Sequence, residues 1–275
     1  MARIFISLTY ALIFFYLTNF AFAGAWTMEK GKMYNKFSIN YFYSEKNFDG
    51  NGHLYSLPND GGFYDFNLTW YQEYGLSDRV AIISSVPYKH LHYEDDDFKS
   101  DSWGVGDIEA GIKFCLLKKP FVLSLQSKVK IPEAYDENED VPLGNGQWDG
   151  ELRVLLGKSL WPTPAYFGME GGYMWRAEAP ADEFKYLFEF GYSLSERFSL
   201  RTKLDGTLSI DNADIVTTSY GNPQLGYEYD LGKLELTATY KMIKNIFMEF
   251  TYTPYVYGKA VSAGNNFSLA VWWTL

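Results

Sequence analysis

The stretch FSLAVWWTL, residues 267–275, ends the chain. Alternate residues in it are apolar or aromatic, and those between them, apart from Trp272, are small or polar. A soluble protein rarely ends on such a strand, because an open apolar edge promotes aggregation. A membrane barrel needs one to pair with its first strand and close the wall. The C-terminal stretch therefore predicts a closed transmembrane β-barrel.

The N-terminus carries the features of an export signal. Arg3 precedes an apolar run over residues 4–22, and Ala21-Phe22-Ala23 is a small-x-small cleavage pattern. A retained membrane anchor is the alternative, but Asn19 and the alanines favour cleavage. We therefore predict a signal peptide over residues 1–23 and a single outer-membrane barrel domain over residues 24–275. No later apolar run is long enough for a membrane helix.

Composition supports an exported barrel and excludes some partners. Aromatic residues make up 19% of the chain, yet the mean hydropathy is only -0.22. A barrel reconciles the two, because half of each strand faces lipid and half faces the lumen. The formal net charge of -10 argues against nucleic acid as a partner. Cys115 is the single cysteine, so the chain has no intrachain disulfide.

Alternating segments of roughly 10–14 residues recur along the chain, as barrel strands require. Short connections alternate with long polar ones, the expected asymmetry of periplasmic turns and extracellular loops. We expect an all-β, antiparallel up-and-down barrel of about twelve strands, with fourteen as the alternative, and a monomer. The alternative arises because residues 220–241 could form one strand or two, and because a further pair could be hidden near residues 53–55. Residues 93–106 are expected to form a long loop.

Charged residues occupy the face opposite the apolar one on three consecutive segments. Consecutive strands of such a barrel are neighbours, so a basic ladder should lie between two acidic ones. The network either fills the interior, as side chains do in narrow barrels, or lines a constriction that selects solutes by charge and size. Both hold if it lines a narrow gap. The predicted lumen-selectivity residues are Asp107, Glu109, Lys113, Lys128, Lys130, Asp149, Glu151, Arg153, Glu189, Arg201 and Lys203.

The histidines give only weak signals for other chemistry. His90 and His92 share a strand face beside acidic residues, which could suggest a divalent metal, but no third ligand has a defined position. A solvated strand end explains them, and we predict no metal site and no cofactor. A hydrolase would need a serine beside His90, and Ser84 and Ser85 are out of reach along an extended strand. No G-x-S-x-G motif is present, so we predict no catalytic residues.

Several stretches resemble one family of exported barrel proteins, described as "MetA-pathway of phenol degradation" or as transporters. They span most of the chain after the predicted signal, and they are strand and turn patterns that identify architecture better than chemistry. The chain departs from such barrels by ending on Leu275 rather than Phe or Trp. The stretches are AWTMEKGKMY (25–34), EYGLSDR (73–79), GDIEAGIKFCLL (106–117), VLSLQSKVKIP (122–132), GELRVLLGKSL (150–160) and YGKAVSAGNNFSLAVWW (257–273).

The resemblance implies passage of hydrophobic or aromatic compounds across the bacterial outer membrane, without a catalytic motif. We therefore expect a channel or transporter for small molecules with a charged lumen, and Tyr71 and Trp272 as contacts if the solute is aromatic. The alternatives are a plugged structural or surface-interaction barrel and an outer-membrane hydrolase. The expected partners are outer-membrane lipid and lipopolysaccharide, the barrel assembly machinery and a small-molecule solute.

Overall fold

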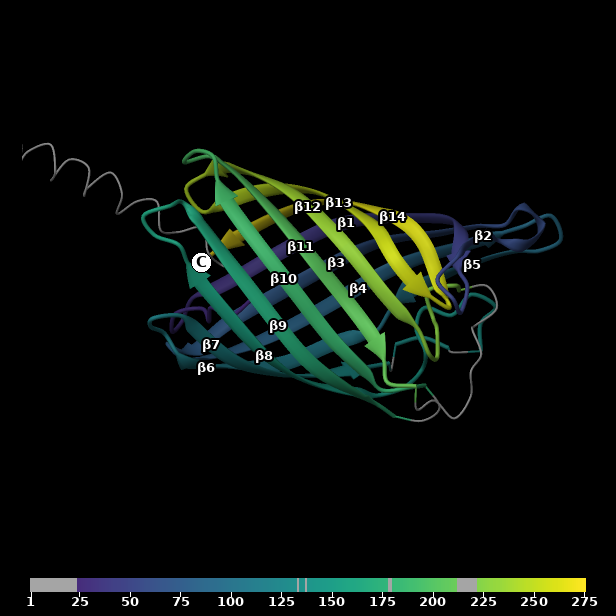
Figure 1. The fold of residues 1–275 in the computed structure, drawn as a ribbon, viewed down its shortest axis with the longest axis horizontal. Helices are drawn as coiled ribbons and strands as arrows, with labels where there is room; N and C mark the ends of the chain where they lie inside the picture. Colours follow the sequence, from purple (N-terminus) through teal and green to yellow (C-terminus); the bar gives the residue numbers. More distant parts are fainter. Residues whose placement is uncertain (1–23, 133, 137, 178–179, 212–221) are drawn as a thin grey trace, which may run out of the picture.

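The computed structural model describes residues 24–132, 134–136, 138–177, 180–211 and 222–275, so the predicted signal peptide lies outside the described residues. Twelve of the described strands form one closed antiparallel wall (Figure 1). No helix in the described part of the chain is long and apolar enough to cross a membrane. The wall strands are β1 (Met33–Phe48), β3 (Gly62–Ser77), β4 (Val80–Glu94), β6 (Ile108–Leu117), β7 (Val122–Ile131), β8 (Asp149–Ser159), β9 (Ala165–Arg176), β10 (Glu183–Ser193), β11 (Phe198–Ser209), β12 (Asp230–Ile243), β13 (Ile246–Lys259) and β14 (Val261–Thr274).

The C-terminal strand closes the wall as its sequence predicts. In the β14–β1 pair, Val271 lies opposite Phe37 and Leu269 opposite Ile39. The backbones of Met33 and Leu275 exchange two hydrogen bonds, of 3.1 and 2.9 Å. The two ends of the sheet therefore satisfy each other's backbone groups, which a strand in lipid cannot leave unpaired.

Two short strands are present in addition to the twelve wall strands, and one of them lies where the sequence predicted a loop. β2 (Leu54–Ser56) pairs with β1, and β5 (Lys99–Val105) pairs with β4. The expectation of a loop over residues 93–106 is therefore wrong. β4 pairs with β6 up to Ser85 and with β5 from Tyr88, so β5 continues the line of β6. The break falls at Pro87, which has no N–H to donate to the ladder.

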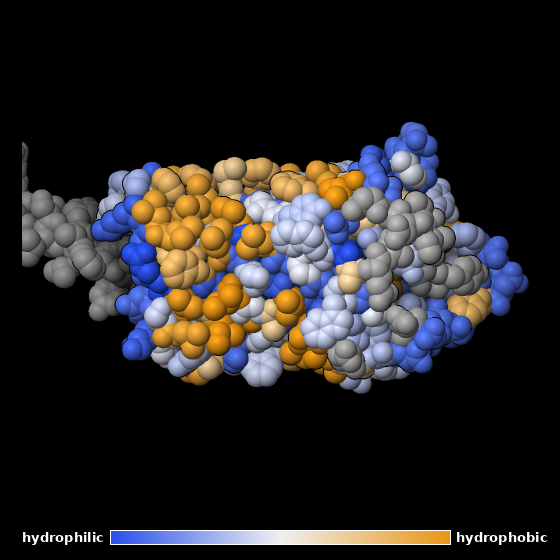
Figure 2. Space-filling model, turned by 90° about the horizontal axis from the view of Figure 1, so that it is seen from below, coloured by the Kyte–Doolittle hydropathy of each residue, from blue (hydrophilic) through white to orange (hydrophobic). Residues whose placement is uncertain are grey.

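The alternation of each strand separates an apolar outer face from a polar inner one. On β10, Phe188 and Phe190 are exposed while Glu189 between them is buried. Apolar residues gather on the outer wall, and hydrophilic residues gather toward the two ends (Figure 2). This is the surface that a barrel presents to lipid.

The C-terminus and the long connections lie at opposite ends of the barrel. The C-terminus lies at the end with the short turns, while β2 and β5 project at the other end (Figure 1). By the usual asymmetry of these barrels, the first end is periplasmic and the second extracellular. The sequence left open whether residues 220–241 form one strand or two. The described part of this region, residues 222–241, contains a single strand, β12.

Candidate functional site: the barrel interior

The three charged segments lie side by side on β6, β7 and β8. In the β6–β7 register Glu109 lies opposite Lys130, and in the β7–β8 register Lys130 lies opposite Asp149. Lys128 similarly lies opposite Glu151. Because these positions alternate with exposed apolar residues, the charged side chains point into the barrel.

Each lysine of the basic ladder bridges carboxylates on both neighbouring strands. The Nζ of Lys128 lies 3.1 Å from Glu109 and 3.9 Å from Glu151. The Nζ of Lys130 lies 2.6 Å from Asp149 and 3.6 Å from Asp107, the residue before β6. The wall thus carries a continuous strip of alternating charge across three strands.

The remaining predicted lumen residues extend this strip round the wall. Arg153 binds Glu151 on its own strand and Glu170 on β9, both at 2.8 Å. Lys203 lies 3.5 Å from Glu189 on β10. Nine of the eleven predicted residues thus lie in two adjoining stretches of wall, and the remaining two, Lys113 and Arg201, join partners that the sequence interpretation did not single out.

Two buried carboxylates are central to the interior and were missed. Glu249 on β13 accepts hydrogen bonds from Lys36 at 2.6 Å and Arg201 at 3.4 Å. Glu73 on β3 pairs with Lys113 at 2.8 Å, and both side chains are buried. The same strand alternation that identified the other residues would have placed both glutamates inside the barrel, because Glu73 adjoins the exposed Tyr74 and Glu249 adjoins the exposed Phe250.

The interior ion pairs line the wall instead of crossing the lumen. Among the described strand residues, each pair joins a strand to itself, to a neighbour, or to the next strand but one. The pairs that skip a strand are Lys36–Glu249, Arg201–Glu249 and Lys113–Glu73. A network of this form holds the wall together without itself blocking a path along the axis.

The segment before β1 enters the periplasmic end of the interior. The carbonyl of Ala25 accepts a 2.5 Å hydrogen bond from the Ser124 hydroxyl, and the carbonyl of Trp26 accepts one of 3.3 Å from Lys113. The Trp26 ring packs edge-on against Tyr166, with 5.9 Å between ring centroids. Gly157 makes room for this ring, because a Cβ there would lie 2.5 Å from it.

The connection between β7 and β8 enters the opposite end. Val141 and Leu143 are fully buried with inward residues of β1, β3 and β4. Lys89 donates a 3.0 Å hydrogen bond to the Leu143 carbonyl, and Asn222 donates one of 2.7 Å to Pro142. The part of this connection around residue 143 lies inside the barrel mouth, where its two apolar side chains fill the space above the wall, whereas residues 138–140 are exposed.

The two paired histidines lie on the outer wall, away from the lumen. His90 and His92 both contact the Asp101 carboxylate, at 2.8 and 2.9 Å. Among the described residues, no group of three histidine, cysteine or acidic side chains has the arrangement to hold a metal ion.

Comparison with solved structures places this fold among outer-membrane barrels. The chain is similar to the COG4313 outer membrane channel from Pseudomonas putida F1, with a TM-score of 0.69, 14% identity, and coverage of 91% of this chain and 98% of that one. It is also similar to the NanC porin, with a TM-score of 0.52, 9% identity, and coverage of 87% and 100%. The translocator domain of the autotransporter NalP from Neisseria meningitidis gives a TM-score of 0.51, 9% identity, and coverage of 90% and 89%.

Sequence comparison adds the family. No curated protein matches the chain. The family model described as "Putative MetA-pathway of phenol degradation" matches residues 56–245, which is more than half of the chain. The expected family, barrel class and outer-membrane location are therefore confirmed. The chain is a bacterial outer-membrane β-barrel that belongs to the family of this description.

Proposed function

We propose that the protein is a gated channel that passes small molecules across the outer membrane. The observation that carries the proposal is the course of the interior ion pairs, which join strands at most two apart and so follow the wall. A barrel built only for structural support has no need to keep its charges on the wall. Passage then requires movement of the segments at residues 25–30 and 141–147, while the wall keeps its ion pairs.

The eleven predicted lumen residues set the charge selectivity of this path. Lys128 pairs with Glu109 on β6 and with Glu151 on β8. The Glu109 side chain is 38% exposed, whereas the Glu151 side chain is 3% exposed. Water therefore reaches part of the ladder, and a passing ion would meet these charges at short range in a medium less polar than bulk water. Removing the positive charges should shift the path toward cations.

Small aromatic solutes are the favoured cargo within this proposal. A small cavity of about 40 Å³ at the periplasmic end is lined by Tyr34, Tyr166 and Trp272 together with Arg201 and Glu249, and it would have to widen, through movement of the segment before β1, before an aromatic ring could enter. Rings with a few polar groups suit a small aromatic molecule that carries a hydroxyl group. The family description, which refers to phenol degradation, agrees with this chemistry. Of the two aromatic contacts expected from the sequence, Trp272 lines this cavity and Tyr71 packs against Tyr34.

Single-channel recording in planar bilayers tests the channel. The refolded protein should show discrete conductance steps, and Lys128→Glu/Lys130→Glu should increase the preference for cations. Lys158→Glu is the control, because it makes the same lysine-to-glutamate reversal, once instead of twice, on an outward-facing position of β8 and should leave selectivity unchanged. A correctly folded barrel that never conducts, even without residues 25–30, would favour a plugged structural barrel instead.

A further inference from the structure

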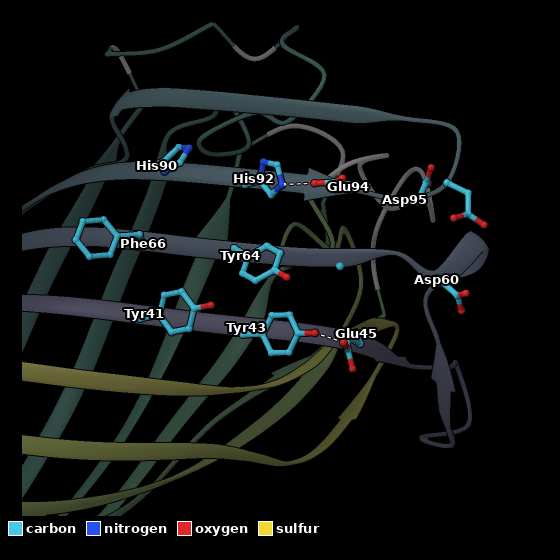
Figure 3. A pocket seen from close by; sticks show the side chains of 12 residues that line it. Tyr41, Tyr43, Glu45, Asp60, Tyr64, Phe66, His90, His92, Glu94 and Asp95 are labelled. Atoms are coloured by element: carbon cyan, nitrogen blue, oxygen red, sulfur yellow. Dashed lines mark hydrogen bonds and ion pairs between the residues drawn. The ribbon is translucent and has the colours of Figure 1, made fainter.

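A hollow on the outer wall lies at the extracellular ends of β1, β3 and β4. Side chains from these strands form three rows on one side of the sheet (Figure 3). The first two rows are aromatic, and the third has a carboxylate at each end with a glycine between them. The rows are Tyr41, Phe66 and His90; Tyr43, Tyr64 and His92; and Glu45, Gly62 and Glu94.

Gly62 is the reason that the rows enclose a groove. It lies opposite Glu94 at the start of β3, so no side chain separates Glu94 from Glu45. A Cβ built at Gly62 would have ordinary contacts, the nearest 3.5 Å away on the Tyr64 ring, so the space is open. The resulting groove has a volume of about 530 Å³, and Asp60, Asp95 and Asp96 complete its rim (Figure 3).

The groove carries a strong excess of negative charge. Five carboxylates line it, and no lysine or arginine does. Glu94 pairs with Lys99 at 2.8 Å and with His92 at 3.2 Å. The other four carboxylates form no ion pair among the described residues, although the Tyr43 hydroxyl donates to Glu45. A cation that enters the groove therefore meets carboxylates that no basic side chain neutralises.

The groove lies at the boundary between lipid and water. A strand crosses the hydrocarbon in about 9–11 residues, so β4, which starts at Val80, leaves it near His90. An aromatic belt at this depth is ordinary in barrels. Carboxylates grouped beside the belt are not part of that pattern, and they would repel the anionic groups of the outer leaflet. The belt explains the rings but not the acidic hollow.

We propose that this groove binds an organic cation that carries an ammonium group on an apolar body. The faces of Tyr43 and Tyr64, whose ring centroids lie 4.8 Å apart, offer cation–π contacts to the ammonium. Glu45 and the aspartates of the rim supply the opposing charge. The apolar body of the ligand rests on the first row of rings. This row continues onto β5, where the Trp103 ring stacks on the His90 ring with 3.5 Å between the ring centroids. The site lies outside the lumen and is independent of channel gating.

Calorimetric titration of the refolded full-length protein with phenyltrimethylammonium tests the site. The detergent is a nonionic maltoside, because zwitterionic detergents carry a competing quaternary ammonium. The neutral isostere tert-butylbenzene measures the contribution of the apolar body alone. We expect one cation per barrel and binding of the isostere weaker by about tenfold, as a desolvated cation–π contact and opposing charge would give.

Three variants place the binding in the groove. Glu45→Gln and Tyr64→Leu should each weaken binding about fivefold to tenfold, and Gly62→Leu should abolish it by filling the hollow. Asp136→Asn is the matched control, because it removes one carboxylate from an exposed loop residue that lies outside the groove. It should leave the affinity unchanged.

Four outcomes would overturn the proposal. Equal affinity for the neutral isostere would mean that the rings act only as a membrane belt. A loss with Asp136→Asn equal to that with Glu45→Gln would mean nonspecific charge attraction. Displacement of the probe by Mg²⁺ at similar concentration would mean that the carboxylates take a divalent ion. The folding of the barrel is verified by heat-modifiable gel mobility. If the folded barrel does not bind the probe at millimolar concentration, the groove is not a site for such cations.

Discussion

The two ends of the barrel are closed in different ways. At the extracellular end, Val141 and Leu143 are buried in an apolar cluster formed by three wall strands. At the periplasmic end, the segment around Trp26 is held by hydrogen bonds to wall residues, by one edge-on ring contact, and by a smaller apolar cluster around Ala25. Apolar burial resists opening in proportion to the area covered, whereas single hydrogen bonds contribute about 1 kcal/mol each.

This difference indicates which end opens more easily. The periplasmic segment makes hydrogen bonds to Lys113, Ser124 and Glu73 in the interior, and Lys113 also pairs with Glu73. If the segment leaves, the Lys113–Glu73 ion pair can stay formed and water can replace the lost hydrogen bonds, so the main loss is the small apolar contact around Ala25. If residue 143 leaves, an apolar cluster is exposed to water. We therefore expect the periplasmic segment to be the gate.

The largest expected effect is on the stability of the wall itself, as distinct from the segments that close its two ends. Lys113→Met should lower the free energy of unfolding by about 3–5 kcal/mol, because it leaves the Glu73 carboxylate buried without its cation. Urea unfolding of the refolded barrel measures this loss. The double variant Lys113→Met/Glu73→Leu should recover most of it, since an apolar pair of similar volume can replace a buried ion pair. A loss below about 1 kcal/mol would show that the wall does not depend on this pair.

A smaller effect should stay within the extracellular closure. Leu143→Ala should weaken the seated loop by about 2–4 kcal/mol through lost burial and the cavity left behind. Limited proteolysis over residues 134–147 should become faster, while the urea midpoint of the barrel should change little, because the loop can open locally. Leu152→Ala, on the lipid-facing side of β8, is the control and should leave the loop protected. Equal destabilisation of loop and barrel would mean that the loop is part of the wall's cooperative unit.

The smallest effect should appear at the periplasmic closure. Trp26→Ala removes the edge-on contact with Tyr166, worth about 1–2 kcal/mol with its burial. The open fraction in single-channel records should rise about tenfold, since 1.4 kcal/mol is a factor of ten. Trp175→Ala, on the exposed face of β9, should leave gating unchanged. If Trp26→Ala and Trp175→Ala give the same records, the segment before β1 is not the gate.

The wall could be predicted from the sequence because its information is local. On β10, Phe188 and Phe190 face lipid and Glu189 faces the interior, and this follows from a period of two alone. The same rule places Glu109, Lys128 and Glu151 inside, and the up-and-down connection makes their strands neighbours. The pairing of β14 with β1 follows because lipid forbids an open edge.

The closures and the groove could not be predicted in this way. β5 has little apolar alternation and forms because β4 extends past Pro87 and offers its edge. The position of Trp26 depends on the space above Gly157, which lies more than a hundred residues later. Leu143 is buried only because Phe63 and Leu91, from two strands, meet at the same mouth.

The sequence by itself therefore determined the barrel, the charged interior face and the number of strands to within a pair, and the structure fixed the wall at twelve. These features follow from alternation, strand length and the need to satisfy every backbone group in lipid. Only the tertiary structure decided what occupies the two mouths, which carboxylates pair with Lys36 and Lys113, and where the acidic groove lies on the outer wall. Those features depend on distances between residues far apart in the chain, which are fixed only when the wall closes.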